Sequence, residues 1–282
     1  MARIKQVFYM TKTTFLEEQH NKRVIMGFIL GITLFGYWLN LFLQYALDTG
    51  EPVNVLEAFV VVEHHHKSIL FLVVGWLLMI SDAPFIKKNT YLLLCRSSRK
   101  QWDAAMLQYI MIQTFLYVAG IVVVSVAVSI LLGFWGNMWS SLVYHLAMDT
   151  NNYLGVKYNI SFPWVNIMQT MTVPQAFMIT FVFLFLYLVL IGFLLYVCNL
   201  LLKEIYGILI VFGIQIAGYL LQQEGITYLL SLMAKAIPGY AIDGNGGQWK
   251  VVVLFCVVIL ILAFVSLWLI GRVDFNDEAE EG

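Results

Sequence analysis

Three consecutive histidines, His64, His65 and His66, are the residues in this sequence best suited to chemistry. Imidazole is a common metal ligand, and short histidine-rich tracts bind metals in many proteins. Consecutive residues on a helix point about 100° apart, so three adjacent rings do not converge on one ion. We therefore expect the tract to be a polar cap at the outer face of a membrane, and metal binding is the weaker interpretation.

A second candidate for chemistry is the acidic pair Glu17-Glu18. It is similar to the paired glutamates of intramembrane CAAX-type proteases. In this chain, however, the pair precedes the first long apolar stretch, and no matching histidines follow within an apolar stretch. The patterns H-E-x-x-H and G-x-S-x-G, typical of zinc proteases and serine hydrolases, are absent from the sequence. We therefore do not expect an enzyme.

No segment of the sequence matches the phosphate-binding pattern G-x-x-x-x-G-K-[ST]. The stretch 244–247 is rich in glycine, but Lys250 is wrongly spaced and no Ser or Thr follows it. Three widely separated cysteines are interpreted as small hydrophobic residues: Cys95, Cys198 and Cys256. The sequence predicts no cofactor in this chain, so any ATP-driven step needs ATP-Mg bound by a partner.

The composition of the chain points to a lipid environment for its helices. Of 282 residues, 61% are hydrophobic and only 12% are charged, and the mean hydropathy is +0.83. Soluble domains usually carry about 25% charged residues. The net charge of −1 gives no reason to expect nucleic-acid binding. A soluble fold of this length cannot bury so much apolar surface in one core, so we expect an integral membrane protein.

We expect an all-α fold in which residues 1–282 form a single transmembrane domain with six spans. A spanning helix needs about 20 mainly apolar residues. The second span is centred on Ile69–Ile80, which is too short alone, so we place its start near Phe59, with Glu63 and the three histidines at its outer end. The other five stretches qualify directly: Val24–Ala46, Ala104–Leu132, Ala176–Leu202, Tyr206–Leu221 and Val251–Ile270.

The distribution of basic residues predicts the orientation of these spans. Cytoplasmic loops of membrane proteins are enriched in Lys and Arg. Of the 16 basic residues, only four lie on the predicted outer side: Lys67, Lys157, Lys235 and Lys250. The other twelve fall before span one, between spans two and three, after span four and after span six. We therefore expect a multi-pass protein of the plasma membrane with both termini in the cytoplasm.

Four segments outside the spans have recognisable character. Residues 1–23 form an expected cytoplasmic amphipathic helix, with apolar residues at helical spacing at Ile4, Val7, Phe8, Phe15 and Leu16. We expect an extracellular loop over 133–175 and an extracellular or re-entrant segment over 222–250. The latter contains a short helix over 226–237 that closes at Pro238. Residues 272–282 form an acidic cytoplasmic tail.

The expected spans contain few polar groups, and we identify no Asp, Glu, Lys or Arg inside them. Their polar residues are scattered amides with a few Ser and Thr: Asn40, Gln44, Gln108, Gln113, Asn199 and Gln215. Ion-coupled carriers often use intramembrane charges, although sites lined by backbone escape this test. This disfavours a secondary transporter or channel, which remains the main alternative, ahead of a membrane enzyme or assembly factor.

The most informative segment is the predicted cytoplasmic stretch 81–103 between spans two and three. Ser81 or Asp82 is suited to cap a helix with Pro84 in its first turn, and Ser97 or Ser98 to cap the next one. Between the caps lies an apolar patch with a basic rim, followed by an aromatic residue at an interfacial position: Tyr91, Leu92, Leu93, Leu94, Arg96, Arg99, Lys100 and Trp102. Orientation alone requires only the basic residues, so the apolar patch indicates a contact with a soluble partner.

The strings SDAPFI, at 81–86, and RSSRKQW, at 96–102, resemble the cytoplasmic signature of ABC-2-type ATP-binding-cassette exporter permeases, particularly small permeases of Gram-positive bacteria. The likeness also covers the order of elements along nearly the whole chain. The resemblance implies a membrane-spanning permease of an ABC exporter, with the translocation path in this chain and ATP hydrolysis in a separate subunit.

The resemblance also implies partners and contact residues. The working unit is expected to contain two permeases in the lipid bilayer, identical or different, and two ATPase subunits. The segment between spans two and three is expected to hold a coupling helix that docks on the ATPase. The matching residues here are Tyr91, Leu92, Leu93, Arg96, Arg99, Lys100 and Trp102. The long outer loop and the triple histidine depart from the family pattern.

Overall fold

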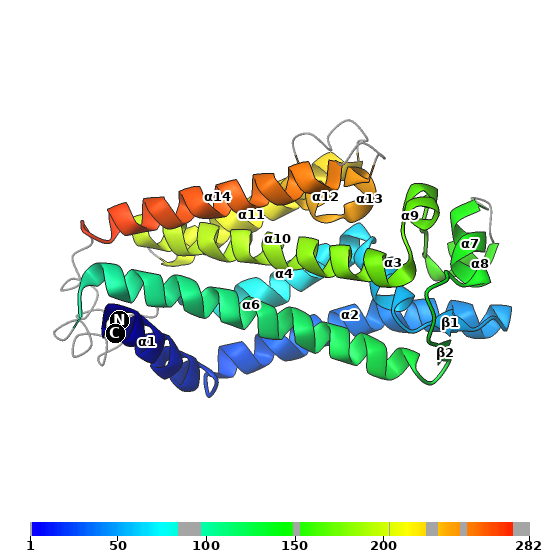
Figure 1. Ribbon diagram of the computed structural model, residues 1–282, viewed down its shortest axis with the longest axis horizontal. Helices are drawn as coiled ribbons and strands as arrows, with labels where there is room; N and C mark the ends of the chain where they lie inside the picture. The colour runs from blue at the N-terminus through cyan, green and yellow to red at the C-terminus, as the bar shows by residue number, and fades with distance from the viewer. Residues whose placement is uncertain are drawn as a thin grey trace.

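The computed structural model describes residues 2–83, 97–148, 153–202, 204–223, 231–242 and 247–272. Its long helices run side by side along the longest axis of the molecule (Figure 1). They are α1 (Ala2–Glu18), α2 (Lys22–Thr49), α4 (His66–Ile80), α6 (Arg99–Ser129), α10 (Val173–Leu201), α11 (Glu204–Gln223) and α14 (Gly247–Leu269). The short helices are α3 (Glu57–Glu63), α7 (Ser141–Met148), α8 (Tyr153–Tyr158), α9 (Val165–Thr170), α12 (Leu232–Ala236) and α13 (Pro238–Ala241).

The all-α expectation is confirmed, apart from two strands of two residues each. Strand β1 (Val53–Asn54) pairs in parallel with β2 (Gly133–Phe134), so the segment after α2 is joined to the segment after α6. Four helices, α2, α6, α10 and α14, are long and apolar enough to cross a membrane. These helices mark the chain as a membrane protein.

The expected second span differs from the prediction. Instead of one helix from Phe59 to Ile80, the chain forms α3 and α4, which meet at an angle of 88°. The break falls at His65, whose backbone is extended with φ −90° and ψ 119°. If the pair counts as one span, the described residues provide five candidates; the apolar part of α11, Ile205–Leu221, is shorter. The count of six spans stays a prediction.

Local capping explains where the long helices begin and end. Ser98 caps α6 by accepting a hydrogen bond from the Gln101 backbone N–H, and the Gln101 side chain accepts one from the Ser98 N–H. This confirms the predicted cap in the Ser97-Ser98 pair. Helix α10 begins with a similar box between Thr172 and Gln175. Helix α2 ends at Gly50, whose φ of 72° favours glycine.

Close packing of α2, α4 and α6 forms the centre of the bundle. A Cβ atom at Gly31 of α2 would overlap the ring of Tyr117 of α6, so only glycine fits this crossing. The Tyr117 hydroxyl donates to the Leu72 carbonyl of α4 at 2.9 Å. The Trp76 indole N–H of α4 donates to the Leu188 carbonyl of α10 at 2.9 Å. In an apolar surrounding these bonds satisfy polar groups that would otherwise be costly to bury.

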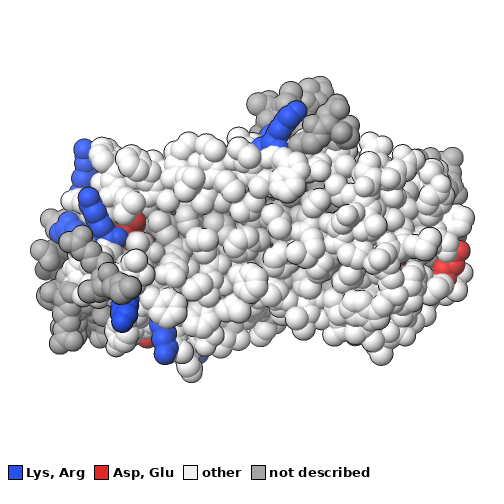
Figure 2. All heavy atoms as spheres, in the orientation of Figure 1, with Lys and Arg blue, Asp and Glu red and all other residues white. Residues whose placement is uncertain are grey.

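The two ends of the bundle differ in charge. We call the end that carries α1 and the first turn of α6 the basic end, and the end that carries β1, β2 and α7–α9 the loop end (Figure 1). On the face shown in Figure 2, Lys and Arg gather mainly at the basic end, and the middle of the bundle shows almost none. Exposed basic residues there include Lys5, Lys12, Lys22, Arg23, Arg99, Lys100 and Arg272. The asymmetry read from the sequence is therefore also an asymmetry in space.

The segments outside the long helices agree with the predictions in part. The predicted N-terminal helix is present as α1, which packs on α6 through Met10 and Thr11 and leaves Ile4 and Phe8 exposed. The predicted helix over 226–237 lies partly outside the described residues, and its described part is α12. Pro238 does not close that helix but begins α13, as its fixed φ allows at a first helical position.

Candidate functional site

The predicted coupling residues divide into two groups. Tyr91, Leu92, Leu93 and Arg96 lie in 84–96, outside the described residues. Arg99 and Lys100 are exposed in the first turn of α6, at the basic end.

Trp102 does not occupy the interfacial position expected from the sequence. Its side chain is 1% exposed and belongs to the core of the bundle. Counting from the cap at Ser98, this first stretch of α6 turns Arg99 and Lys100 outward and Trp102 inward. Trp102 therefore packs beneath that surface and does not itself contact a soluble partner.

A network of buried polar side chains lies directly inside the basic end. Asn199 of α10 is 4% exposed, and its Nδ2 atom donates to the carbonyl of Ala83 at 2.6 Å and to that of Ser81 at 3.3 Å. These carbonyls follow the last turn of α4. Asn199 therefore fixes the point where the chain enters 84–96.

The second part of this network is centred on Asp103 of α6, which is fully buried. Its Oδ1 atom accepts a hydrogen bond from the Tyr196 hydroxyl of α10 at 2.7 Å, and its Oδ2 atom accepts one from the Ser266 hydroxyl of α14 at 3.1 Å. Both carboxyl oxygens are thus partnered. The carboxyl group thereby links α6, α10 and α14. It lies five residues after the Ser98 cap, close to the point where the chain leaves 84–96.

Tyr196 and Asn199 are three residues apart and therefore lie on the same face of α10. One turn of α10 is thus hydrogen-bonded to both the entry and the exit of 84–96. We call the set Asn199, Tyr196, Asp103 and Ser266 the α10 clamp. The clamp couples the positions of α4, α6, α10 and α14 at the basic end.

Two further contacts brace the clamp from outside. Arg23 at the start of α2 pairs with Asp82, just after α4. The Thr11 hydroxyl of α1 lies 3.1 Å from the Gln108 Oε1 atom and 3.3 Å from the Ala105 carbonyl oxygen, both on α6. Helix α1 is therefore attached to the first turns of α6.

Sequence reasoning missed Asp103. The sequence predicts no acidic residue within a span, whereas the structure buries this carboxyl inside α6. The available signal was a single acid just inside a helix whose cap was recognised at Ser98. In the sequence Asn199 is only one of several scattered amides, because its partners are backbone carbonyls distant in sequence.

The triple histidine lies at the break between α3 and α4. Glu63 is fully buried and His64 is 3% exposed, so these two residues do not form the polar cap expected at an outer face. The His64 Nδ1 atom lies 2.7 Å from the Val60 carbonyl. His65 is partly exposed and packs on Trp38, with ring centroids 4.1 Å apart. The burial follows from the 88° bend, which turns the end of α3 into the bundle.

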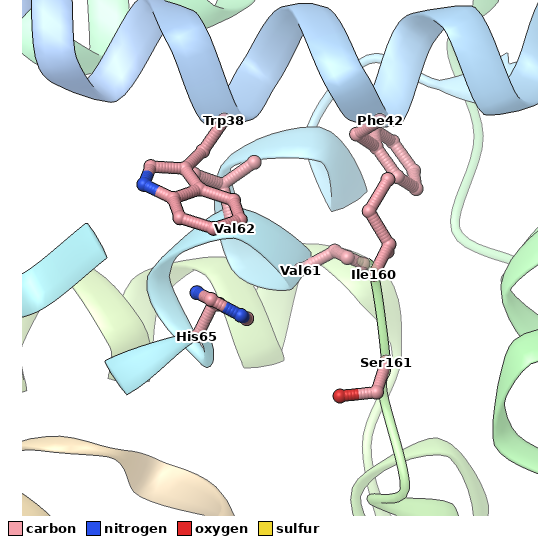
Figure 3. A pocket seen from close by; sticks show the side chains of 7 residues that line it. All are labelled: Trp38, Phe42, Val61, Val62, His65, Ile160 and Ser161. Carbon is pink, nitrogen blue, oxygen red and sulfur yellow. The ribbon is translucent and has the colours of Figure 1, made fainter. Parts of the chain in front are cut away.

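A small pocket opens beside this break (Figure 3). Its lining comes from α2, α3 and the segment before α9, with His65 and Trp38 on one side and Ser161 on the other. Within the described residues, no group of three or more His, Cys, Asp or Glu side chains is arranged to hold a metal ion. The metal interpretation of His64, His65 and His66 thus gains no support from the described part of the chain.

Comparisons with known proteins return no identification. No protein-family model matches the chain, and no curated protein or solved structure matches it.

Proposed function

We propose that this chain is the membrane-spanning permease subunit of an ABC exporter of the ABC-2 type, driven by a separate ATPase subunit. In this proposal the protein has six spans, formed by α2, the broken pair α3–α4, α6, α10, α11 and α14. The basic end faces the cytoplasm of a plasma membrane, which places both termini there. Helix α1, with exposed Ile4 and Phe8 beside Lys5, lies along the inner leaflet.

The observation that carries this proposal is the α10 clamp. A docking segment transmits force only if both of its ends are firmly attached to the membrane helices. Asn199 fixes the entry of 84–96, and the Asp103–Tyr196 bond fixes the exit, both on one turn of α10. A displacement of the segment by an ATPase would therefore move α4, α6 and α10 together. An orientation signal alone would need the basic residues but no such attachment.

The exposed faces of the long helices support an assembly within the membrane. In the most apolar window of α14, only 17% of the residues are buried within this chain, and in that of α2 only 33%. Lipid or a second permease must cover these faces. A translocation path between two permeases, opened alternately to the two sides as ATP is hydrolysed, fits this arrangement.

The main alternative, a secondary transporter or channel, is favoured by one observation. Glu63 is a buried acid at a break in a candidate span, and broken helices with buried ionisable groups line the sites of many ion-coupled carriers. The clamp at the opposite end has no evident purpose in such a carrier. We therefore retain the exporter permease as the proposed function.

The experiment that tests the proposal is purification of the tagged full-length chain from its native membranes in a mild detergent. We expect a chain with the G-x-x-x-x-G-K-[ST] pattern to co-purify and the complex to hydrolyse ATP. The matched comparison is Leu93→Asp, which should lose that chain, against Arg99→Ala, which should retain most of it. Transport by vesicles that hold this protein alone, driven by a proton or sodium gradient, would refute the proposal and support the alternative.

A further inference from the structure

Buried polar atoms without hydrogen-bond partners gather at the break between α3 and α4. Within the described residues, neither carboxyl oxygen of Glu63 has a partner, and the same holds for the Nε2 atom of His64 and the hydroxyl of Ser68. All three side chains are at most 3% exposed. Nearly all buried polar side-chain atoms in folded proteins are hydrogen-bonded. With the Nδ1 atom of His65, four side chains with such atoms fall within six residues of chain, which indicates a site with a specific purpose.

No described basic residue lies within ion-pair distance of the Glu63 carboxyl group. The nearest basic residues along the chain are the histidines and Lys67, and none of them forms an ion pair with it. From α6, Tyr117 lies close enough to interact with Glu63 electrostatically, and its hydroxyl donates to the Leu72 carbonyl. Among the described residues, Glu63 is thus an acid without a counter-charge.

The other described elements packed on α3 place no charged side chain beside Glu63. Helix α10 contains no Asp, Glu, Lys, Arg or His. The charged residues of α2 lie in its first turn and at Asp48. Trp38 is the α2 residue that packs on His65. Asp48 is ten residues further along the helix, which is about 15 Å away. Strand β1 has no ionisable side chain, and Glu57, at the far end of α3, accepts hydrogen bonds from Ser140 and Asn54.

The pocket beside the break is lined by Val62 and His65, which flank Glu63 and His64 along the chain, and its size limits what can enter there. The pocket of Figure 3 has a volume of about 10 Å³, close to the minimum for one water molecule. It has no room for an organic solute, and the described residues provide no metal-binding group. A proton is the ligand that fits both the carboxyl group and the space.

We propose that Glu63 is an intramembrane proton-binding site, and that release of its proton opens the α3–α4 break toward the pocket lined by His65 and Ser161. The O–H bond of the carboxylic acid breaks, and the proton passes to water at the pocket. The carboxylate that remains has no partner in an apolar surrounding, which is costly. The break must therefore admit water, which separates α3 from α4. This inference does not depend on the proposed transport function.

The test uses the full-length protein, free of native cysteines, in lipid nanodiscs. Val62→Cys places a thiol in the lining of the pocket, at a position that is 3% exposed. Its rate of alkylation by a soluble maleimide is measured against pH, with Glu63 intact and with Glu63→Gln as the matched background. Gln has the shape of the protonated acid but cannot release a proton. We expect alkylation to rise several-fold more steeply with pH when Glu63 is intact, whereas the Gln background follows only the ionisation of the thiol.

A second readout observes the proton directly. Infrared spectra at neutral pH should contain a carboxylic-acid C=O band that is lost in Glu63→Gln and kept in the control Glu17→Gln, which changes an exposed acid of α1. Equal alkylation profiles in the two backgrounds, or a spectrum unchanged by Glu63→Gln, would overturn the proposal. Failure of Glu63→Gln to fold would also overturn it, because a neutral isostere should replace a protonated acid.

Discussion

Removal of the Tyr196 hydroxyl tests whether the α10 clamp stabilises the basic end. Tyr196→Phe keeps the ring, which is fully buried, and deletes only the donor to the Asp103 Oδ1 atom at 2.7 Å. Hydrogen bonds to charged groups contribute about 1.5–3 kcal/mol, and bonds between neutral partners about 0.5–1.5 kcal/mol. Asp103 keeps one partner, Ser266, so half of its carboxyl group is left unsatisfied. We expect Tyr196→Phe to lower the free energy of unfolding by about 1.5–3 kcal/mol.

The matched control is Tyr187→Phe, about two and a half turns away on the same helix. Tyr187 is also fully buried, and its hydroxyl donates to the neutral Oε1 atom of Gln215 on α11. We expect that substitution to lower the free energy of unfolding by about 0.5–1.5 kcal/mol. Both values are measured by reversible unfolding in mixed micelles, followed by tryptophan fluorescence.

A double-mutant cycle with Asp103→Asn isolates the pair. We expect Tyr196→Phe to have a smaller effect in the Asp103→Asn background than in the wild type, because the partner charge is already gone. If Tyr196→Phe is no more destabilising than Tyr187→Phe, or if the two clamp substitutions are additive, the carboxyl group does not act as the junction described here.

Three further predictions address topology, coupling and packing. Single cysteines at Lys157 and Lys100 in a cysteine-free background should react with an impermeant reagent from outside and inside respectively, and the reverse pattern would invert the proposed orientation. Leu92→Asp should weaken ATPase association more than Arg99→Ala, since burying a leucine contributes about 1.5–3 kcal/mol and an exposed ion pair about 0–1 kcal/mol; equal affinities in a pull-down would refute the coupling role. Gly31→Ala should destabilise the bundle, because its Cβ atom would meet the ring of Tyr117, whereas Gly36→Ala, which meets nothing, should not; melting temperatures compare the two.

The sequence alone determined the class of protein and the approximate extent of its long helices, because both depend on local composition and spacing. Continuous apolar stretches located α2, α6, α10 and α14 to within a few residues, and the Ser98 cap was recognisable from its type and position. The asymmetry of basic residues was also visible without a structure, since it requires only a count along the chain.

Only the tertiary structure decided which polar residues are buried together. Asp103 and Tyr196 are far apart in sequence, and Asn199 binds backbone carbonyls, which no residue pattern reveals. Likewise, the sequence predicts Glu63 at the outer end of a straight span, where water would solvate it. The 88° bend between α3 and α4 places it inside the bundle instead, because a bend depends on how the surrounding helices pack and not on hydropathy.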